Sequence, residues 1–168
     1  IDYLDTARGT TNPVSVTFDC VANDGNATFD GGLENAGCTA QHMNGMQGTN
    51  GNDTLTADGG SSVLYGQGGN DVMDGGDATD QLLGGPGDDT ITGGGGHDQV
   101  DGDYSGGSNT VNDTIYLRDG QYDQLLSCGG GTDSAQLDAG MTDVVTAVDC
   151  ETLDRGDGSG TGGGTNPN

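Results

Sequence analysis

The sequence contains no tryptophan and no lysine, and only 4% of its residues are aromatic and 29% hydrophobic. These fractions are too low for an ordinary globular core, and taken alone they indicate disorder. Three arginines stand against 27 acidic residues, which gives a formal net charge of −24. Nucleic acids and anionic membranes are poor partners for such a charge. No apolar run reaches the roughly eighteen residues that a membrane span requires.

Aspartate and glycine make up much of what is present. All but two of the acidic residues are aspartate, the exceptions being Glu34 and Glu151, and there are 36 glycines. A merely solvated acidic surface would mix glutamate with aspartate. The bias toward aspartate indicates tight turns and short side chains that can bind cations.

Aspartates recur on a nine-residue grid, and a hydrophobic residue follows each grid position two residues later. Only Ser62 interrupts the grid, and glycines precede most of the aspartates. The aspartates are Asp53, Asp71, Asp80, Asp89 and Asp98, and the hydrophobic residues are Leu55, Leu64, Met73, Leu82, Ile91 and Val100. After a longer gap the spacing becomes ten, at Asp113, Asp123, Asp133 and Asp143. A stacked coil with an ion in each turn explains the regular recurrence of aspartate, of the hydrophobic residue and of glycine together.

The blocks over 48–101 resemble the calcium-binding RTX nonapeptide, G-G-x-G-x-D-x-U-x, in which U is a large apolar residue. The resemblance covers about 48–153 and implies an all-β fold, a parallel β-roll or β-solenoid. Two blocks would form one turn of eighteen residues, with three-residue strands whose middle side chain points inward. One buried side chain per block cannot offset the entropy of ordering nine residues, so we expect folding to depend on calcium.

The resemblance also implies where several calcium ions would bind, namely between stacked turns. One edge would run Asp53–Asp71–Asp89 and the other Ser62–Asp80–Asp98, and the site with Ser62 would be weakest because it lacks a charge. The aspartates 113, 123, 133 and 143 would extend the series. Carbonyl ligands would come from Thr49, Gly51, Gly66 and Gly68 for Asp53/Asp71, from Gln67, Gly69, Gly84 and Pro86 for Asp71/Asp89, and from Gly76, Ala78, Gly93 and Gly95 for Asp80/Asp98. The alternative, that the aspartates only form Asx turns, does not require a strict ninefold period.

The four cysteines fall into two pairs with spacings close to one turn. Cys20 and Cys38 are 18 apart, and Cys128 and Cys150 are 22 apart. Residues stacked on neighbouring turns lie within disulfide range, so we predict these two disulfides, each closing one end of the roll. Four cysteines allow three connectivities, and zinc is the rival interpretation, although no Cys-x-x-Cys pair supports it. Disulfides indicate an oxidising, extracellular setting.

We divide the chain into five parts. These are an N-terminal β cap (1–47), a regular roll (48–101), an inserted loop (102–112), decapeptide repeats with a C-terminal cap (113–155) and a glycine-rich tail (156–168). Alternating polarity predicts a strand over 14–18, with a second over 33–36. Thr152 and Leu153 are expected to begin the C-terminal cap. The start of the insertion superficially resembles an EF-hand loop, but its twelfth position is Asn112 rather than glutamate.

No catalytic motif occurs: there is no H-E-x-x-H, no G-x-S-x-G and no lysine for a Schiff base. We therefore interpret the chain as a non-catalytic extracellular calcium-binding structural module, a subunit of a bacterial surface fibre or adhesin stalk. Its partners would be calcium and copies of itself arranged head to tail, with the tail held by a neighbour. The alternative is the secretion-associated repeat region of a larger enzyme or toxin. A glycan- or ice-binding module ranks last, because the outward positions show no continuous row of threonine or aromatics.

Overall fold

The computed structural model describes residues 15–17, 45–57, 59–104, 110–139, 143–146 and 149–156, which contain strands and no helix. The strands are β1 (Ser15–Thr17), β2 (Met46–Gln47), β3 (Thr54–Thr56), β4 (Val63–Tyr65), β5 (Val72–Asp74), β6 (Gln81–Leu83), β7 (Thr90–Thr92), β8 (Gln99–Asp101), β9 (Thr114–Leu117), β10 (Gln124–Ser127), β11 (Ser134–Leu137), β12 (Val144–Val145) and β13 (Thr152–Asp154). Within the described part of the chain, no helix has the length and apolar character of a membrane span.

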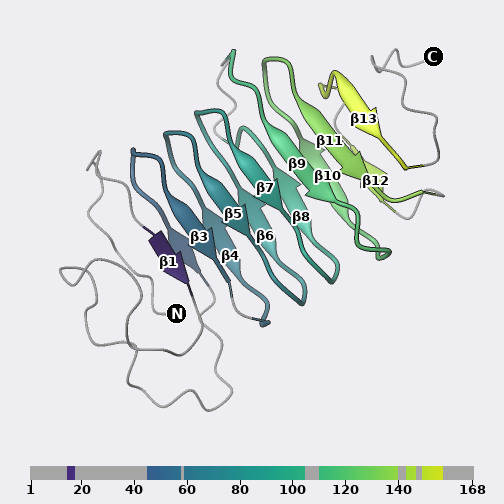
Figure 1. Ribbon diagram of the computed structural model, residues 1–168, viewed down its shortest axis with the longest axis horizontal. Coiled ribbons are helices and arrows are strands. Elements are labelled where there is room, and N and C mark those ends of the chain that lie inside the picture. The colour runs from purple at the N-terminus through teal and green to yellow at the C-terminus, as the bar shows by residue number, and fades with distance from the viewer. Residues whose placement is uncertain are drawn as a thin grey trace.

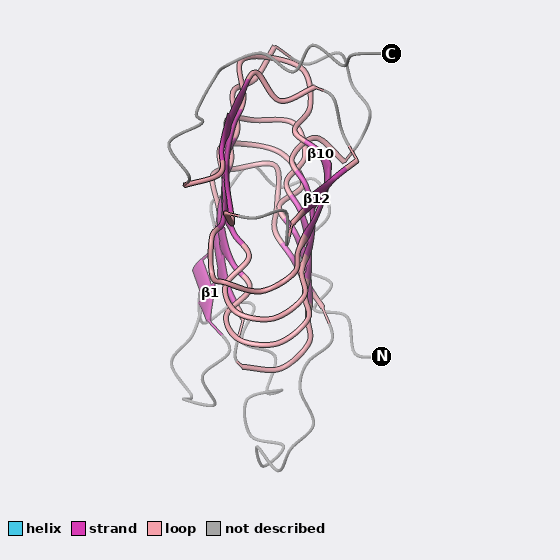
Figure 2. Ribbon diagram, turned by 90° about the vertical axis from the view of Figure 1, so that its right-hand side faces the viewer, coloured by secondary structure: helices cyan, strands magenta, loops and turns pink. Residues whose placement is uncertain are grey.

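The strands form two parallel sheets that face each other, and the chain passes from one to the other at every turn. Odd-numbered strands make a seven-stranded sheet in the order β1-β3-β5-β7-β9-β11-β13, and even-numbered strands make a six-stranded sheet from β12 to β2. Figure 1 shows the strands stacked in chain order, and Figure 2 shows the two sheets on either side of a narrow interior. The predicted all-β parallel roll is confirmed.

Each regular strand buries its middle side chain between the sheets. The inward side chains are at most 2% exposed from the second strand through the eleventh: Met46, Leu55, Leu64, Met73, Leu82, Ile91, Val100, Ile115, Leu125 and Ala135. In a three-residue strand only the middle side chain faces one side, which explains the nine-residue hydrophobic period. The four-residue strands β9 and β11 bury a second residue each, Leu117 and Leu137.

The insertion does not break the stack. Strand β9 pairs with β7 in the register Thr90↔Thr114, as if no residues had been added between them. Strands β9 and β11 continue at a spacing of twenty, with Ala135 opposite Ile115. The roll therefore continues in register past the insertion.

The strand predicted around Val16 is confirmed as β1, which pairs with β3 in the register Val16↔Leu55. Where the C-terminal cap was expected to begin, the structure has the strand β13, which forms one more rung on β11. The second strand predicted near the N-terminus, over 33–36, lies outside the described residues. So do Cys20 and Cys38.

Consecutive blocks belong to opposite sheets, so the outward side chains form a separate row on each sheet. On the seven-stranded sheet, the first outward position is threonine or serine in every rung from β3 to β13 except one, where Val72 stands. The row is Thr54, Val72, Thr90, Thr114, Ser134 and Thr152.

Candidate metal sites between turns

The aspartates of successive turns stack into two ladders, one along each edge of the roll. In each rung, an aspartate accepts a hydrogen bond at Oδ1 from the backbone N–H of its counterpart one turn earlier, as from Asp53 N–H to Asp71 Oδ1 at 2.8 Å. The first ladder runs through Asp53, Asp71, Asp89, Asp113 and Asp133, and the second through Ser62, Asp80, Asp98, Asp123 and Asp143. The structure thus brings together the residues of both predicted edges, in the predicted order.

The second carboxylate oxygen in most rungs has no partner. These oxygens are shielded from solvent and accept no hydrogen bond: they are Oδ2 of Asp71, Asp89, Asp98, Asp113, Asp123 and Asp133. The side chains that carry them are at most 2% exposed. A buried charged oxygen without a partner is costly, so a recurring set of them indicates a missing positive charge.

A carbonyl oxygen from the next turn converges with these carboxylates beside a glycine. A Cβ placed on Gly66 would lie 2.3 Å from Asp71 Oδ2 and 2.7 Å from the Gly84 carbonyl oxygen. The same convergence occurs on the other edge, where Gly75 faces Asp80 Oδ2 and the Gly93 carbonyl. Any larger residue would fill the space between these oxygens, which is why the repeats begin with glycine.

Three of the predicted carbonyl ligands, Gly66, Gly84 and Gly93, stand beside the Oδ2 atoms of Asp53, Asp71 and Asp80 in this way. Five other carbonyl oxygens would lie within 2.6 Å of a Cβ placed on a glycine of the following turn: those of Gly51, Gln67, Gly69, Gly76 and Ala78. The carbonyls of Thr49 and Pro86 accept inter-turn hydrogen bonds, from the N–H groups of Gly68 and Gly69. The role of the carbonyl oxygens of Gly68 and Gly95 as ligands stays a prediction.

Burial is the main cause that raises the pKa of these carboxyls from the ordinary value of 3.8. It brings the pKa of Asp89 to about 8, and the pKa values of Asp71, Asp113 and Asp123 to about 7. The pKa of Asp98 rises to about 6. Hydrogen bonds from backbone N–H groups oppose the shift, while neighbouring aspartates in the ladder raise the pKa further. Without a cation, the folded chain therefore favours the protonated form of these carboxyls over the ionised form.

The ends of the ladders differ from the middle. Asp53 is held within its own turn, because the Thr49 N–H donates to its Oδ2 and the Thr49 hydroxyl lies 3.1 Å from the same oxygen. At the far end of the other ladder, Asp143 Oδ2 accepts from the Asp138 N–H at 2.6 Å. Protein donors thus engage carboxylates at two ladder ends, whereas the inner rungs leave their Oδ2 atoms for another partner.

The donor set of the inner rungs fits calcium. Calcium is a hard cation that takes six to eight oxygen ligands from carboxylates and backbone carbonyls. Carboxylate and carbonyl oxygens from adjacent turns are what the ladders bring together, and no nitrogen or sulfur donor stands among them. The inner aspartates with an unpartnered oxygen are the residues that would hold the ions.

Sequence reasoning missed two features of the ladders. Glu151 adds a final rung, since its Oε2 accepts from the Asp133 N–H at 2.7 Å. A third, exposed ladder runs beside the first, in which Asn52, Asn70, Asp88 and Asn112 each accept at Oδ1 from a backbone N–H one turn later. In the sequence, an asparagine or aspartate directly precedes Asp53, Asp71, Asp89 and Asp113, and this pattern could have predicted the exposed ladder.

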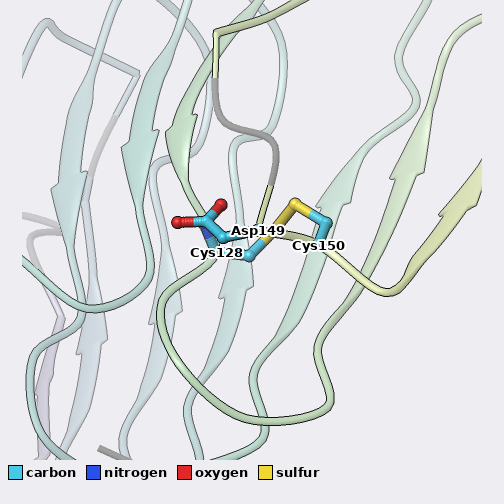
Figure 3. Close-up of side chains that lie close together, drawn as sticks. All are labelled: Cys128, Asp149 and Cys150. Carbon is cyan, nitrogen blue, oxygen red and sulfur yellow. A yellow bond between two sulfur atoms is a disulfide. The ribbon is translucent and has the colours of Figure 1, made fainter. Parts of the chain in front are cut away.

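Cys128 and Cys150 form the predicted disulfide, with their Cα atoms 5.2 Å apart, and so link two successive turns. Figure 3 shows Asp149 beside the bond. Asp149 accepts from the Cys128 N–H at 3.1 Å and from the Ser127 hydroxyl at 2.7 Å. Among the described residues, Cys128, Asp149 and Cys150 are the one group of three or more His, Cys, Asp or Glu close enough to share a metal ion. Because both sulfurs are in the disulfide, the zinc alternative fails for this pair.

One protein family matches the chain: its model, described as the RTX calcium-binding nonapeptide repeat in four copies, covers residues 47–82 and 74–103. Neither the curated proteins nor the solved structures contain a match.

Proposed function

Because residues 47–103 belong to the RTX calcium-binding nonapeptide repeat family, we propose that this chain is a structural module of a secreted bacterial protein that folds when calcium binds. RTX repeats bind calcium, and a roll built from them is a non-catalytic module. RTX repeats are typical of secreted bacterial proteins, which is why we place the module outside the cell. The disulfide between Cys128 and Cys150 agrees with an oxidising compartment.

The observation that carries the proposal is the row of buried, unpartnered carboxylate oxygens between turns. Like charges one turn apart repel, and the narrow core offers only one or two hydrophobic side chains per strand against that repulsion. A divalent cation between two turns removes the repulsion and joins the turns through shared oxygen ligands. Calcium then acts as the chain's main cohesive element, and the folded module exists only where calcium is plentiful.

We further propose that the module works as a spacer or fibre subunit that stacks head to tail. The outermost strands of the larger sheet, β1 and β13, each pair on one side only within the described part of the chain. A free strand edge is a template for pairing with another chain. The parallel strands of one copy can therefore continue those of the next, along the axis seen in Figure 1.

The test uses the whole purified chain at about 2 mM calcium and after exhaustive metal removal, conditions that bracket the affinities of extracellular calcium modules. Circular dichroism measures β structure, and calorimetry counts bound ions. The proposal expects β structure and several bound ions in calcium, and loss of β structure without it. A chain that keeps the same β signal without metal, or that binds no calcium, contradicts the module.

Electron microscopy of the calcium-loaded chain tests assembly separately. Linear arrays with the width of one roll support the fibre subunit. Isolated particles at every concentration contradict it, and they favour the alternative, a repeat region within a larger secreted enzyme or toxin.

A further inference from the structure

One turn on the edge of the first ladder has a cysteine where the three turns before it have glycine. In each of these turns a carbonyl oxygen lies beside the Oδ2 of the ladder aspartate one turn earlier, and the carbonyls belong to Gly66, Gly84, Gly102 and Cys128. A Cβ on Gly102 would lie 2.6 Å from Asp113 Oδ2 and nearer still to the Cys128 carbonyl oxygen. A half-cystine therefore supplies the oxygen that glycine supplies in the earlier turns.

The carboxylate that faces this carbonyl has an oxygen without a partner. Asp113 is 1% exposed, and its Oδ2 accepts no hydrogen bond. With the Cys128 carbonyl it forms the same pair of donors that stands between the other turns of this edge. Carboxylate and carbonyl oxygens are the ligands that calcium takes in proteins. An ion bound at Asp113 would therefore contact a residue that belongs to a disulfide.

Cys128 is restrained from two directions. Its sulfur is bonded to that of Cys150 in the following turn, with the two Cα atoms 5.2 Å apart. Its N–H donates to Asp149 Oδ1 at 3.1 Å, and Figure 3 shows this carboxylate beside the disulfide. Both cysteines are buried, so the bond lies within the stacked turns. Breaking the bond removes the covalent restraint on the residue whose carbonyl faces Asp113.

We propose that the calcium site at Asp113 and the disulfide form one redox-sensitive device, in which the Cys128 carbonyl is a calcium ligand and the disulfide fixes its position. This inference rests on the proposed function, since it needs calcium between the turns. In the oxidised chain the ligand is already in place, whereas in the reduced chain calcium must also order it. Because such coupling is reciprocal, calcium at this site makes the disulfide harder to reduce. Extracellular conditions supply both calcium and oxidation, and the two reinforce each other at the C-terminal turns.

The test measures how readily a dithiol reduces this disulfide in the full chain at about 2 mM calcium. Reduction breaks the sulfur–sulfur bond: two electrons and two protons pass from the dithiol to the two sulfurs, which become thiols, and the dithiol becomes a disulfide. Buffers of reduced and oxidised dithiothreitol set the equilibrium. Alkylation and peptide mass spectrometry then report the state of Cys128 and Cys150 separately from that of Cys20 and Cys38.

The variant Asp113→Asn removes one charge from the site. Its amide oxygen keeps the acceptor for the Asp89 N–H, which donates to Asp113 Oδ1 at 2.8 Å. Calcium then binds this site weakly and no longer stabilises the disulfide. We expect the equilibrium constant for reduction to rise about tenfold, which corresponds to a shift of about 30 mV in the reduction potential.

The matched control is Asp71→Asn in the same ladder. The Oδ2 of Asp71 is also unpartnered, its Oδ1 also accepts a backbone N–H at 2.8 Å, and burial raises the pKa of Asp71, like that of Asp113, to about 7. The carbonyl beside Asp71 belongs to Gly84, which is in no disulfide. The control should therefore change the equilibrium constant for reduction less than about twofold, because distant sites act independently.

Isothermal titration calorimetry measures the reverse effect, that of the disulfide on calcium binding. In the double variant Cys128→Ser with Cys150→Ser, we expect one binding step to weaken about tenfold and the others to change less than about twofold. A disulfide that only stabilises the fold would weaken all steps alike, and that result overturns the coupling. So does a double variant that stays unfolded in excess calcium, because mass action restores a fold that has lost only one restraint.

The remaining outcomes also decide the question. Equal reduction constants in the wild-type chain and Asp113→Asn, or an equal shift in both aspartate variants, overturn the coupling and leave the proposed function standing. If Asp113→Asn does not fold in calcium, the calorimetry of the serine variant decides alone. A wild-type chain that binds no calcium removes the proposed function itself.

Discussion

Removal of calcium at neutral pH should unfold the roll, and mild acid should restore it without any metal. Five ladder carboxyls have pKa values of about 6 to 8 in the folded chain, against 3.8 for the free side chain. Between these values the folded state keeps protons that the unfolded state has lost. The metal-free fold therefore loses stability as pH rises from about 4 to 8, and it keeps that stability below about 4.

The free energy by which these carboxyls destabilise the metal-free fold is large compared with the stability of a domain. One pKa unit corresponds to about 1.4 kcal/mol, so at about pH 7.5 each of these carboxyls destabilises the metal-free fold by about 3–5 kcal/mol. Two or three of them match the whole 5–15 kcal/mol by which domains are typically stable. At about pH 5 the same carboxyls are mostly protonated, and each costs about 2 kcal/mol or less.

The assay is circular dichroism of chain dialysed free of metal, since a chelator would itself be protonated in acid. We expect little β signal at about pH 7.5, a larger β signal at about pH 5, and a full β signal at pH 7.5 once calcium is added. A calcium titration should also show weaker binding as pH falls, because protons compete for the same oxygens. A metal-free chain that is equally folded at both pH values, or more folded at the higher one, refutes the reasoning.

Four further predictions concern stability in saturating calcium, measured by chemical denaturation unless stated otherwise. Ala78→Gly should raise the free energy of unfolding by about 0.5–1 kcal/mol, because Ala78 has a φ of 96°, where an L side chain is strained; an unchanged midpoint contradicts this. Gly94→Ala should prevent stable folding, because its Cβ would lie 1.9 Å from the Gly76 carbonyl oxygen, and a fully folded variant argues against the stacking described. Replacing Cys128 and Cys150 together by serine should cost about 3 kcal/mol, and a loss below about 1 kcal/mol would show that the disulfide does not hold the terminal turns. Ser62→Asp should add a carboxylate to the second ladder, so calorimetry should show one tighter calcium step, with Thr54→Asp on an outward face as the control that leaves binding unchanged.

Much of the fold followed from periodicity in the sequence. The hydrophobic residue two places after each aspartate identified the buried positions such as Leu55 and Ile91, because a three-residue strand has one inward side chain. The same period placed Asp71 over Asp53, and the spacing of about one turn identified the disulfide of Cys128 and Cys150. These features depend on local spacing, which a sequence displays directly.

Other features depend on how distant turns meet, and spacing alone does not reveal them. Asp113 stacks on Asp89 across a separation of 24 residues, although a regular turn has eighteen. Glu151 completes a ladder although it lies off every grid, since its longer side chain reaches the Asp133 N–H. The row of Thr54, Val72 and Thr90 on the larger sheet likewise depends on the pairing of alternate blocks, which lie in the same sheet.

The most direct test is a crystal structure of the chain grown in calcium, with anomalous scattering data that locate the ions. The account predicts a calcium peak between adjacent turns beside each unpartnered Oδ2, from Asp71 to Asp133, with carbonyl oxygens of both turns at about 2.3–2.6 Å. A well-ordered roll without anomalous peaks between its turns would contradict the claim that calcium holds them together.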